Sequence, residues 1–134
     1  MALNPYINFN GNCREAVNFY SDIFKTEKPI IMTYGESHNG ELGEEVKDLV
    51  MHTYLNIQGL TIMFSDFSPD MEFILGNNTS LTIVSKDMDE IRYLYDRLKE
   101  GGKIDMELQE TFWSKLYGSL VDKFGLIWQF SHEE

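Results

Sequence analysis

The 134-residue sequence contains one cysteine, Cys13, and only three prolines. A single cysteine excludes an intramolecular disulfide framework, which is typical of intracellular proteins. No apolar run reaches the roughly 18 uncharged residues that a membrane-spanning helix needs. The segment Met1–Tyr6 lacks the basic region and long apolar core of a signal peptide. These absences predict a cytoplasmic protein with no membrane partner.

Basic residues are also scarce: 11 lysines and arginines stand against 22 aspartates and glutamates, for a net charge of −11. Binding to polyanions depends on clustered lysine and arginine, so nucleic acid is not an expected partner. Such acidity keeps a protein soluble and names no ligand, although it weakly favours neutral or cationic ligands over anions.

What the chain does contain is enough apolar material for one domain. Hydrophobic residues make up 43% of the sequence, and a chain of this length buries roughly 65–70% of its unfolded surface. We therefore expect a single domain over residues 1–134 whose core needs neither a metal nor a disulfide.

Two segments carry the signals of amphipathic helices. Asn12 followed by Glu15, and Asp87 followed by Glu90, fit the capping box in which a cap side chain and a residue three positions later satisfy helix amides. The pair Gly101–Gly102 fits the end of the second helix. The apolar positions at helical spacing are Ala16, Phe19, Tyr20 and Ile23 in the first helix and Ile91, Leu94, Tyr95 and Leu98 in the second.

A seven-residue segment occurs twice. Gly59–Ser65 and Gly125–Ser131 share Gly, Leu, Phe and Ser at matching positions, and both fit short apolar strands. From helix cap to this glycine the first half has 47 residues and the second 38. The nine extra residues fit best in Gly35–Glu45, a Gly- and Glu-rich stretch that predicts an exposed, mobile loop.

Strand signals complete the same order in each half. The architecture is therefore βαβββ written twice, with modules at about 1–66 and 79–134 and a linker at about 67–78. The expected strands are Tyr6–Phe9, Ile30–Tyr34, Val50–Ile57 and Leu60–Ser65 in the first module, and Ser80–Val84, Lys103–Leu108, Tyr117–Val121 and Leu126–Ser131 in the second.

Alternation within the strands predicts which side chains share a face. Gln58–Gly59 fits a two-residue hairpin turn. This turn pairs Thr53 with Phe64 and Leu55 with Ile62 on a face that packs beneath a helix. The other face carries the pairs His52 with Ser65, Tyr54 with Met63, and Asn56 with Thr61. In the second copy Trp128 and Phe130 belong to the packing face and Gln129 to the other. The mixed face fits either a ligand cavity or a surface that meets water or a dimer partner.

Several stretches resemble the PhnB-type branch of the vicinal-oxygen-chelate superfamily, which includes glyoxalase I, bleomycin-resistance proteins and extradiol dioxygenases. These stretches are Asn4–Ala16, Phe19–Tyr20, Thr111–Trp113, Gly118–Leu120 and Asp122–Gly125. The resemblance implies an α+β fold in which two βαβββ modules form a curled, eight-stranded mixed sheet around a cleft, and it implies a homodimer. Members are often labelled demethylubiquinone methyltransferases, but the sequence has no Gly-rich strand-to-helix loop for S-adenosylmethionine.

Enzymes of this superfamily bind a divalent metal through the first and last strands of each module. The resemblance places those positions at Pro5, Met63, Ser80 and Gln129, of which only Gln129 is a ligand, and a weak one. A shifted register would offer Asn4 or Asn8 instead. We therefore expect no metal and no cofactor. The same alignment turns Pro5, Ile7 and Phe9 towards the cleft, whereas simple alternation buries Ile7 and Phe9 and exposes Tyr6 and Asn8.

His52, the one histidine in mid-strand, is the candidate for proton transfer or hydrogen bonding near neutral pH. The alternative is a structural histidine bonded to Ser65. His38 and His132 are expected to be surface residues. Trp113 and Tyr117 fit either the wall of a cleft or a packing or dimer contact.

Three further residues have weaker claims on chemistry. Cys13 stands at the first helical position, where amide dipoles lower the pKa of a thiol, but without a histidine nearby we do not expect a nucleophile. Asp66 and Asp70 border the linker, where acidic residues are usually solvated, although they could mark the entrance of a cleft.

The sequence thus predicts a metal-free small-molecule-binding protein. The alternative is an enzyme, either metal-dependent with non-standard ligands or acid–base through His52, and a third possibility is a dimer with no ligand. The expected ligand-binding residues are His52, Tyr54, Met63, Ser80, Trp113, Tyr117 and Gln129.

Overall fold

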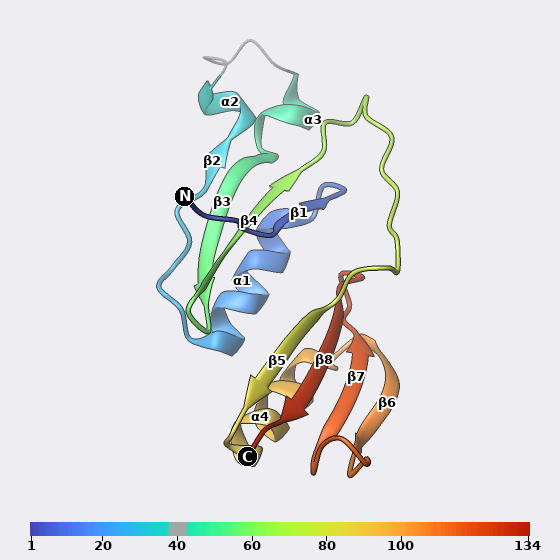
Figure 1. Cartoon of the computed structure of the whole chain (residues 1–134). Helices are drawn as coiled ribbons and strands as arrows, with labels where there is room; N and C mark the ends of the chain where they lie inside the picture. The colour runs from blue at the N-terminus through green and yellow to red at the C-terminus, as the bar shows by residue number, and fades with distance from the viewer. Residues whose placement is uncertain (38–42) are drawn as a thin grey trace. The chain divides into compact units, whose positions relative to one another are not determined.

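The computed structural model describes residues 1–37 and 43–134, which form two compact units, Met1–Ile74 and Leu75–Glu134 (Figure 1). The first unit contains β1 (Tyr6–Phe9), α1 (Cys13–Phe24), β2 (Met32–Thr33), α2 (Tyr34–Ser37), α3 (Glu44–Lys47), β3 (Val50–Ile57) and β4 (Leu60–Asp66). The second contains β5 (Leu81–Ser85), α4 (Met88–Leu98), β6 (Lys103–Gln109), β7 (Tyr117–Val121) and β8 (Ile127–His132). The predicted α+β fold with two βαβββ modules is confirmed.

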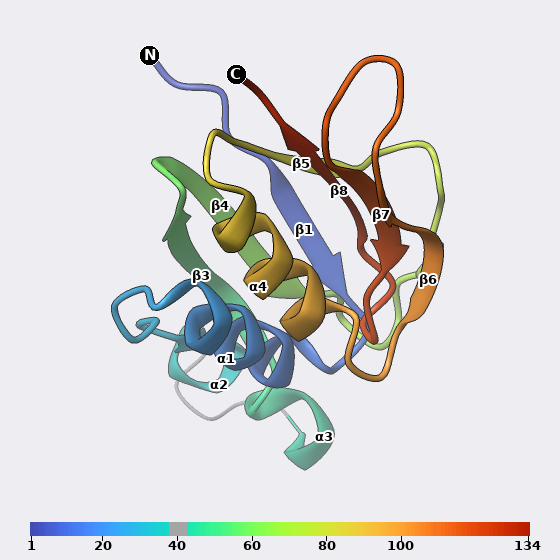
Figure 2. The same ribbon diagram turned by 90° about the horizontal axis from the view of Figure 1, so that it is seen from below.

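The described strands form two separate four-stranded mixed sheets, with the orders β1-β4-β3-β2 and β5-β8-β7-β6. In each sheet the first strand of the module runs parallel to the last, and the remaining pairs are antiparallel. A parallel pair needs a long crossover, and α1 and α4 lie within these crossovers. Each helix consequently packs against its own sheet, α1 on β3 and β4 and α4 on β5 and β8. Figure 2 shows β8 between β5 and β7 in the second sheet.

The hairpin between β3 and β4 has the predicted register. Gln58 and Gly59 both have positive φ, 52° and 82°, as a two-residue turn that matches strand twist requires. Leu55 therefore lies opposite Ile62 and Tyr54 opposite Met63. Leu55 and Ile62 are buried on the helix side, which confirms the predicted packing face.

The orientation of β1 follows simple alternation, and the orientation implied by the resemblance is wrong for Phe9. Phe9 is buried and stacks on Phe64, with ring centroids 6.1 Å apart, and Phe64 stacks in turn on Tyr20 of α1. Tyr6 and Asn8 lie on the opposite face of the sheet beside their partners in β4. Burying an aromatic side chain under a helix stabilises the fold by about 1.5–3 kcal/mol, and this term fixes the register.

The second core is built in the same way from α4 and its sheet. Tyr95 meets Phe130 edge to face at a centroid distance of 5.4 Å, and Trp128 is fully buried. The helix positions predicted from the sequence, Ile91, Leu94, Tyr95 and Leu98, are all buried.

The predicted loop Gly35–Glu45 is only partly a loop. Its start belongs to α2 and its end to α3, which contradicts the expectation of a wholly irregular segment, while residues 38–42, including His38, lie outside the described residues. The backbone at Gly35 passes close to Lys47, because a Cβ there would lie 2.9 Å from the Lys47 carbonyl oxygen. Two helical turns thus pack together where composition predicts an irregular loop, while Glu36, Glu44 and Glu45 are exposed as expected.

Asp66 is not a solvated linker residue, and that prediction is wrong. It is 2% exposed, its Oδ1 accepts hydrogen bonds from the amides of Gly11 and Cys13, both at 2.9 Å, and its Oδ2 accepts one from Val50 at 2.9 Å. The start of α1 is therefore capped from β4. The predicted cap, Asn12, makes no side-chain cap bond, because its backbone (φ −114°, ψ 22°) lacks the extended conformation that a cap needs.

In the second unit the buried carboxylate belongs to Asp122, which is 3% exposed. Its Oδ1 accepts hydrogen bonds from the amides of Phe124 and Leu126, at 2.8 and 3.1 Å. Its Oδ2 accepts one from the indole nitrogen of Trp128 at 2.9 Å. Helix α4 is capped locally, as predicted, by Asp87, whose side chain accepts from two amides of the first turn.

None of the helices among the described residues combines the length and the apolar composition that a membrane span requires.

Candidate functional site

Each sheet has one face turned away from the long helix of its own unit, called its open face below, and the predicted ligand residues within strands fall on these two faces. On the first sheet we define the open face by Tyr6, Asn8, His52, Tyr54, Asn56, Thr61, Met63 and Ser65. Strand registers place Tyr6 beside Met63, and Met63 beside Tyr54. The three residues predicted in this module therefore share one surface.

His52 has a partner that the sequence did not predict. The Tyr6 hydroxyl lies 3.0 Å from His52 Nδ1, and the two ring centroids are 5.7 Å apart. Ser65, the partner expected for a structural histidine, instead donates to Asn8 Oδ1 at 2.7 Å. The alternation of side chains along β1 could have predicted Tyr6 as a residue of this face, because it places Tyr6 on the same side of the sheet as Met63. The pair can hold or transfer a proton at a partly exposed position.

Tyr34 stands near this pair and keeps its proton. Its hydroxyl donates to the Asp66 backbone carbonyl at 2.8 Å. Burial raises the pKa of the Tyr34 phenol above its ordinary value, and the Asp66 carboxylate, Tyr6 and Asp70 raise it further. At neutral pH Tyr34 is therefore a hydrogen-bond donor and not a base.

On the open face of the second sheet, three predicted residues form one hydrogen-bonded chain. The Tyr117 hydroxyl donates to Gln129 Oε1, and Gln129 Nε2 donates to Ser80 Oγ at 2.7 Å. Beside them Ser119 donates to Asp105 Oδ2 at 3.0 Å. These bonds hold the polar groups at fixed positions on an otherwise partly apolar surface.

Trp113 is the fourth predicted residue of this module. Its ring meets Tyr117 edge to face at 5.3 Å, and it is 53% exposed. It lines a hollow of about 620 Å³ in the second unit, whereas Ser80, Tyr117 and Gln129 are not among the residues that line this hollow. The structure thus links Trp113 to the other three through Tyr117 and not through a shared cavity.

The positions that bind metal in the superfamily do not fit a divalent cation here. Tyr6 lies beside Met63 in the first sheet, and Thr82 lies beside Gln129 in the second, so Tyr6 and Thr82 are equivalent positions. Ser80 is two residues before Thr82, and its counterpart two residues before Tyr6 is therefore Asn4 and not Pro5. Asn4 donates its amide to the Thr61 carbonyl at 3.0 Å. A thioether and a neutral hydroxyl are poor ligands for a hard cation, and two uncharged amide oxygens are too few to hold one. In residues 1–37 and 43–134 no three His, Cys, Asp or Glu side chains group as a metal site.

Two residues differ from their sequence predictions. Burial and, to a smaller extent, the Asp66 carboxylate raise the pKa of the Cys13 thiol, whereas Arg14 lowers it. The balance of these effects puts the pKa far above the ordinary value of 9.0. Burial therefore outweighs any lowering by the helix amides, and it works against a nucleophilic role for Cys13. His132 is not a plain surface residue, because its Nδ1 is buried and has no hydrogen-bond partner among the described residues.

Comparison with known proteins gives consistent relatives. The model of a family described as 3-demethylubiquinone-9 3-methyltransferase matches residues 1–131. Protein YjdN of Escherichia coli (strain K12) is 33% identical over 137 residues, covering 96% of this chain and 92% of that protein. The crystal structure of PA1353 from Pseudomonas aeruginosa is 30% identical with a TM-score of 0.89, covering 99% of this chain and 98% of that one.

A PhnB protein from Bacillus cereus is 27% identical with a TM-score of 0.81, covering 99% of this chain and all of that one. A glyoxylase/bleomycin resistance protein/dioxygenase domain from Frankia sp. EAN1pec is 13% identical with a TM-score of 0.68, a likeness of fold alone, over 100% of this chain and 98% of that one. The chain therefore belongs to the PhnB-like family described as 3-demethylubiquinone-9 3-methyltransferase, and it shares its fold with glyoxylase/bleomycin resistance/dioxygenase domains.

Proposed function

We propose that the chain is a small-molecule-binding protein that works without a metal ion. The ligand contacts in this proposal are His52, Tyr54 and Met63 on the first open face, and Ser80, Trp113, Tyr117 and Gln129 in the second module. Ligand sites in proteins combine a few fixed polar groups with large apolar side chains, and both faces have this composition.

The observation that carries the proposal is the chain from Tyr117 through Gln129 to Ser80. Gln129 occupies a position where the superfamily's enzymes hold a metal ligand, yet its carbonyl oxygen already accepts a hydrogen bond. A polar group fixed in this way is ready to orient an organic ligand, since little side-chain entropy remains to be lost. The same bond works against metal ligation by Gln129.

The methyltransferase in the family's description receives no support from these residues. The strand-to-helix connections are Asn10–Asn12 in the first module and Lys86–Asp87 in the second. Both are short, and neither forms a Gly-rich loop of the kind that holds a nucleotide-like cofactor.

A thermal-shift screen of uncharged and cationic small molecules tests the proposal. A ligand at 100 times its Kd adds about 2.7 kcal/mol to the free energy of unfolding, which raises the melting temperature by several degrees. Gln129→Leu should remove a large part of that shift for a ligand on the second face. Elemental analysis of protein purified without chelator accompanies the screen, and stoichiometric Zn, Ni, Mn or Fe would contradict the metal-free proposal.

Acid–base catalysis through His52 is the second candidate function, and the Tyr6–His52 distance of 3.0 Å favours it. With a substrate in hand, His52→Ala should abolish turnover, and Tyr6→Phe should shift its pH profile. Unchanged turnover in His52→Ala would reject this candidate.

The proposal also includes a single domain and a cytoplasmic homodimer. The side chains of Ile74, Leu75 and Phe112 are exposed, and they support association because removing large apolar side chains from water favours it. Light scattering should give twice the chain mass of 15.6 kDa, and a monomeric mass at all concentrations would reject the dimer.

A further inference from the structure

The segment between β6 and β7 forms a tight, well-bonded turn. The Thr111 amide donates to the Ser114 carbonyl at 2.9 Å, and the Ser114 amide donates to Thr111 Oγ1 at 3.2 Å. These two bonds close the turn around Phe112 and Trp113. The two aromatic residues therefore stand at the tip of a defined structure.

Ser114 fastens this turn to the last strand. It is 7% exposed, and its Oγ lies 3.0 Å from each of the backbone carbonyls of Leu116 and His132, which share its one hydrogen as acceptors. The same oxygen accepts a hydrogen bond from the His132 amide at 3.1 Å. The position of the turn over β8 is thus set by a buried side chain. The hollow of about 620 Å³ lies here, with Val84, Ser131 and His132 among its lining residues.

The aromatic wall of the hollow is ordered by ring contacts. Trp113 meets Phe112 edge to face at a centroid distance of 4.7 Å and Tyr117 at 5.3 Å. Phe112 is 97% exposed and Trp113 53% exposed. Such exposure of a held indole ring leaves a π surface free to receive a ligand, and π faces attract cations.

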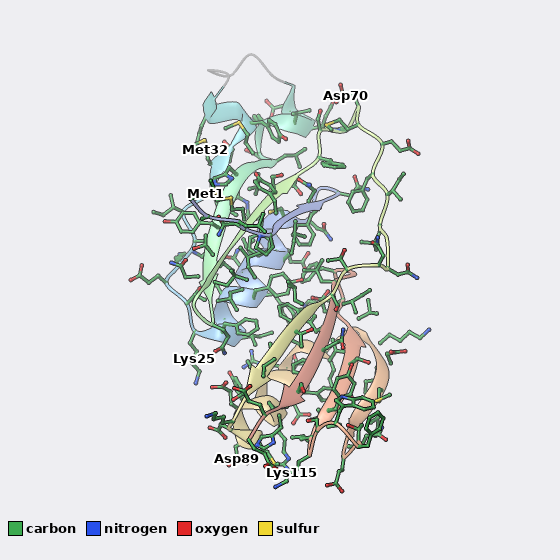
Figure 3. All side chains as sticks on the ribbon, in the orientation of Figure 1. Met1, Lys25, Met32, Asp70, Asp89 and Lys115 are labelled. Atoms are coloured by element: carbon green, nitrogen blue, oxygen red, sulfur yellow. The ribbon has the colours of Figure 1, made fainter. Side chains whose placement is uncertain are left out.

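Acidic residues complete the lining. Glu110, Glu133 and Glu134 stand against one base, Lys115, which lies at the end of the second unit (Figure 3) and pairs with Glu134 at 2.8 Å. The charges of Glu134 and Lys115 cancel in their ion pair. The carboxylates of Glu110 and Glu133 therefore make the electrostatic potential in the hollow negative. A hollow with one dominant sign of charge concentrates ions of the opposite sign.

One of the residues that line the hollow, His132, has an unsatisfied polar atom. Nδ1 of His132 is buried and, in the part of the chain that the structure describes, it has no hydrogen-bond partner. A buried polar atom without a partner costs free energy.

We propose that this hollow binds an organic cation, specifically an aromatic or aliphatic ammonium group held between the Trp113 ring and the carboxylates of Glu110 and Glu133. The inference rests on the proposed binding function and gives it a ligand class and a place.

The test is a titration followed by proton–nitrogen NMR of the full chain, with benzylammonium, benzyl alcohol and phenylacetate as probes of equal shape and different charge. The chain has two tryptophans: Trp113 reports on the hollow, and Trp128, buried and bonded to Asp122, serves as the internal control. Benzylammonium should shift the Trp113 indole signal to saturation and leave that of Trp128 in place. Phenylacetate should not shift it.

Charge variants sharpen the result. Glu133→Gln and Glu110→Gln should each raise the Kd of benzylammonium by about two- to fivefold, whereas Glu72→Gln, an exposed site in the first unit, should leave it unchanged. Higher salt should weaken the binding of benzylammonium to the native chain, and it should have a smaller effect on the variant that carries both Glu110→Gln and Glu133→Gln.

The possible failures are separable. Equal binding of all three probes at Trp113 would overturn the cation assignment while leaving the binding function intact. A thermal shift by some compound without any change at Trp113 would overturn the place. No binding of any compound in the broad screen would reject the proposed function itself.

Discussion

The two modules repeat one order of strands and helix, yet each buries a different carboxylate for a different purpose. Asp66, at the end of β4, joins the start of α1 to the start of β3, through partners up to 55 positions away. Asp122, after β7, accepts hydrogen bonds from Phe124, Leu126 and Trp128, two to six positions away, and so stabilises the turn that leads into β8. Repetition of a fold therefore preserves the apolar registers but does not preserve the polar groups that connect them.

The helix starts show the same contrast. Helix α4 begins with its own cap, Asp87, which satisfies the amides of Asp89 and Glu90. Helix α1 depends on Asp66, a residue that joins it only when β4 has paired with β1. The first module therefore relies on long-range order for a contact that the second forms locally.

The largest expected effect separates the two buried carboxylates. Asp66→Ala leaves three amides without an acceptor, two of them in buried surroundings, and should lower the free energy of unfolding by about 4 kcal/mol. Asp122→Ala should cost about 2 kcal/mol, because only the indole N–H of Trp128 loses its acceptor in buried surroundings. The amides of its turn are only partly buried, so water can replace part of their lost bonding. Urea denaturation monitored by circular dichroism measures both.

Asp70→Ala is the matched control, since Asp70 is exposed on the segment after β4 (Figure 3) and should change stability by less than about 0.5 kcal/mol. If Asp66→Asn is as stable as the native chain, the carboxylate is not what holds the first module together. Equal losses for Asp66→Ala and Asp122→Ala would remove the distinction between long-range and local roles.

Much of the fold was predictable because it depends on local pattern. Alternation and the Gln58–Gly59 turn gave the β3–β4 register, and Asp87 gave the start of α4. The role of Asp66 was not predictable, because its partners are distant in sequence and an acidic residue beside a linker has the composition of a solvated one. The α2 and α3 turns were missed because Gly and Glu carry no apolar period.

The candidate site divides in the same way. The alternation of side chains along the strands predicted which sheet face His52, Tyr54 and Met63 share. The repeated segment Gly125–Ser131 predicted the face of Gln129 in the same way. Tyr6 was left out because the resemblance favoured the wrong face of β1, and burial of Phe9 decided the matter. The hollow beside Trp113 was beyond prediction, since it depends on how Ser114 fastens a turn to β8.

A smaller effect distinguishes the modules at alkaline pH. The pKa of the Cys13 thiol is raised in the folded chain, mainly by burial and then by Asp66, so the thiol ionises first in the unfolded state. The protonated thiol makes its full contribution to stability below pH 9.0, the ordinary pKa that the thiol has in the unfolded chain. Above that pH the free energy of unfolding falls by about 1.4 kcal/mol per pH unit. Cys13→Ala should remove this slope.

The measurement compares urea midpoints of the two chains between pH 8 and pH 10. Tyr34 and Tyr95 have raised pKa values in both chains, so their contribution cancels in the difference. Parallel pH profiles would show that Cys13 is exposed in solution, as would rapid reaction of the native thiol with a disulfide reagent.

The smallest effect concerns the two predicted caps. Asp87→Ala removes the acceptor for two amides of α4 and should cost about 1 kcal/mol, the usual value of an N-cap. Asn12→Ala, at the corresponding position of α1, should change the free energy of unfolding by less than about 0.5 kcal/mol, because its side chain makes no cap bond. A loss of 1 kcal/mol at Asn12 would mean that α1 is capped locally after all, and the Asp66 bonds would then be redundant. The ordering expected here, a large loss at Asp66, a small one at Asp87 and none at Asn12, follows from which oxygen atom the helix amides reach.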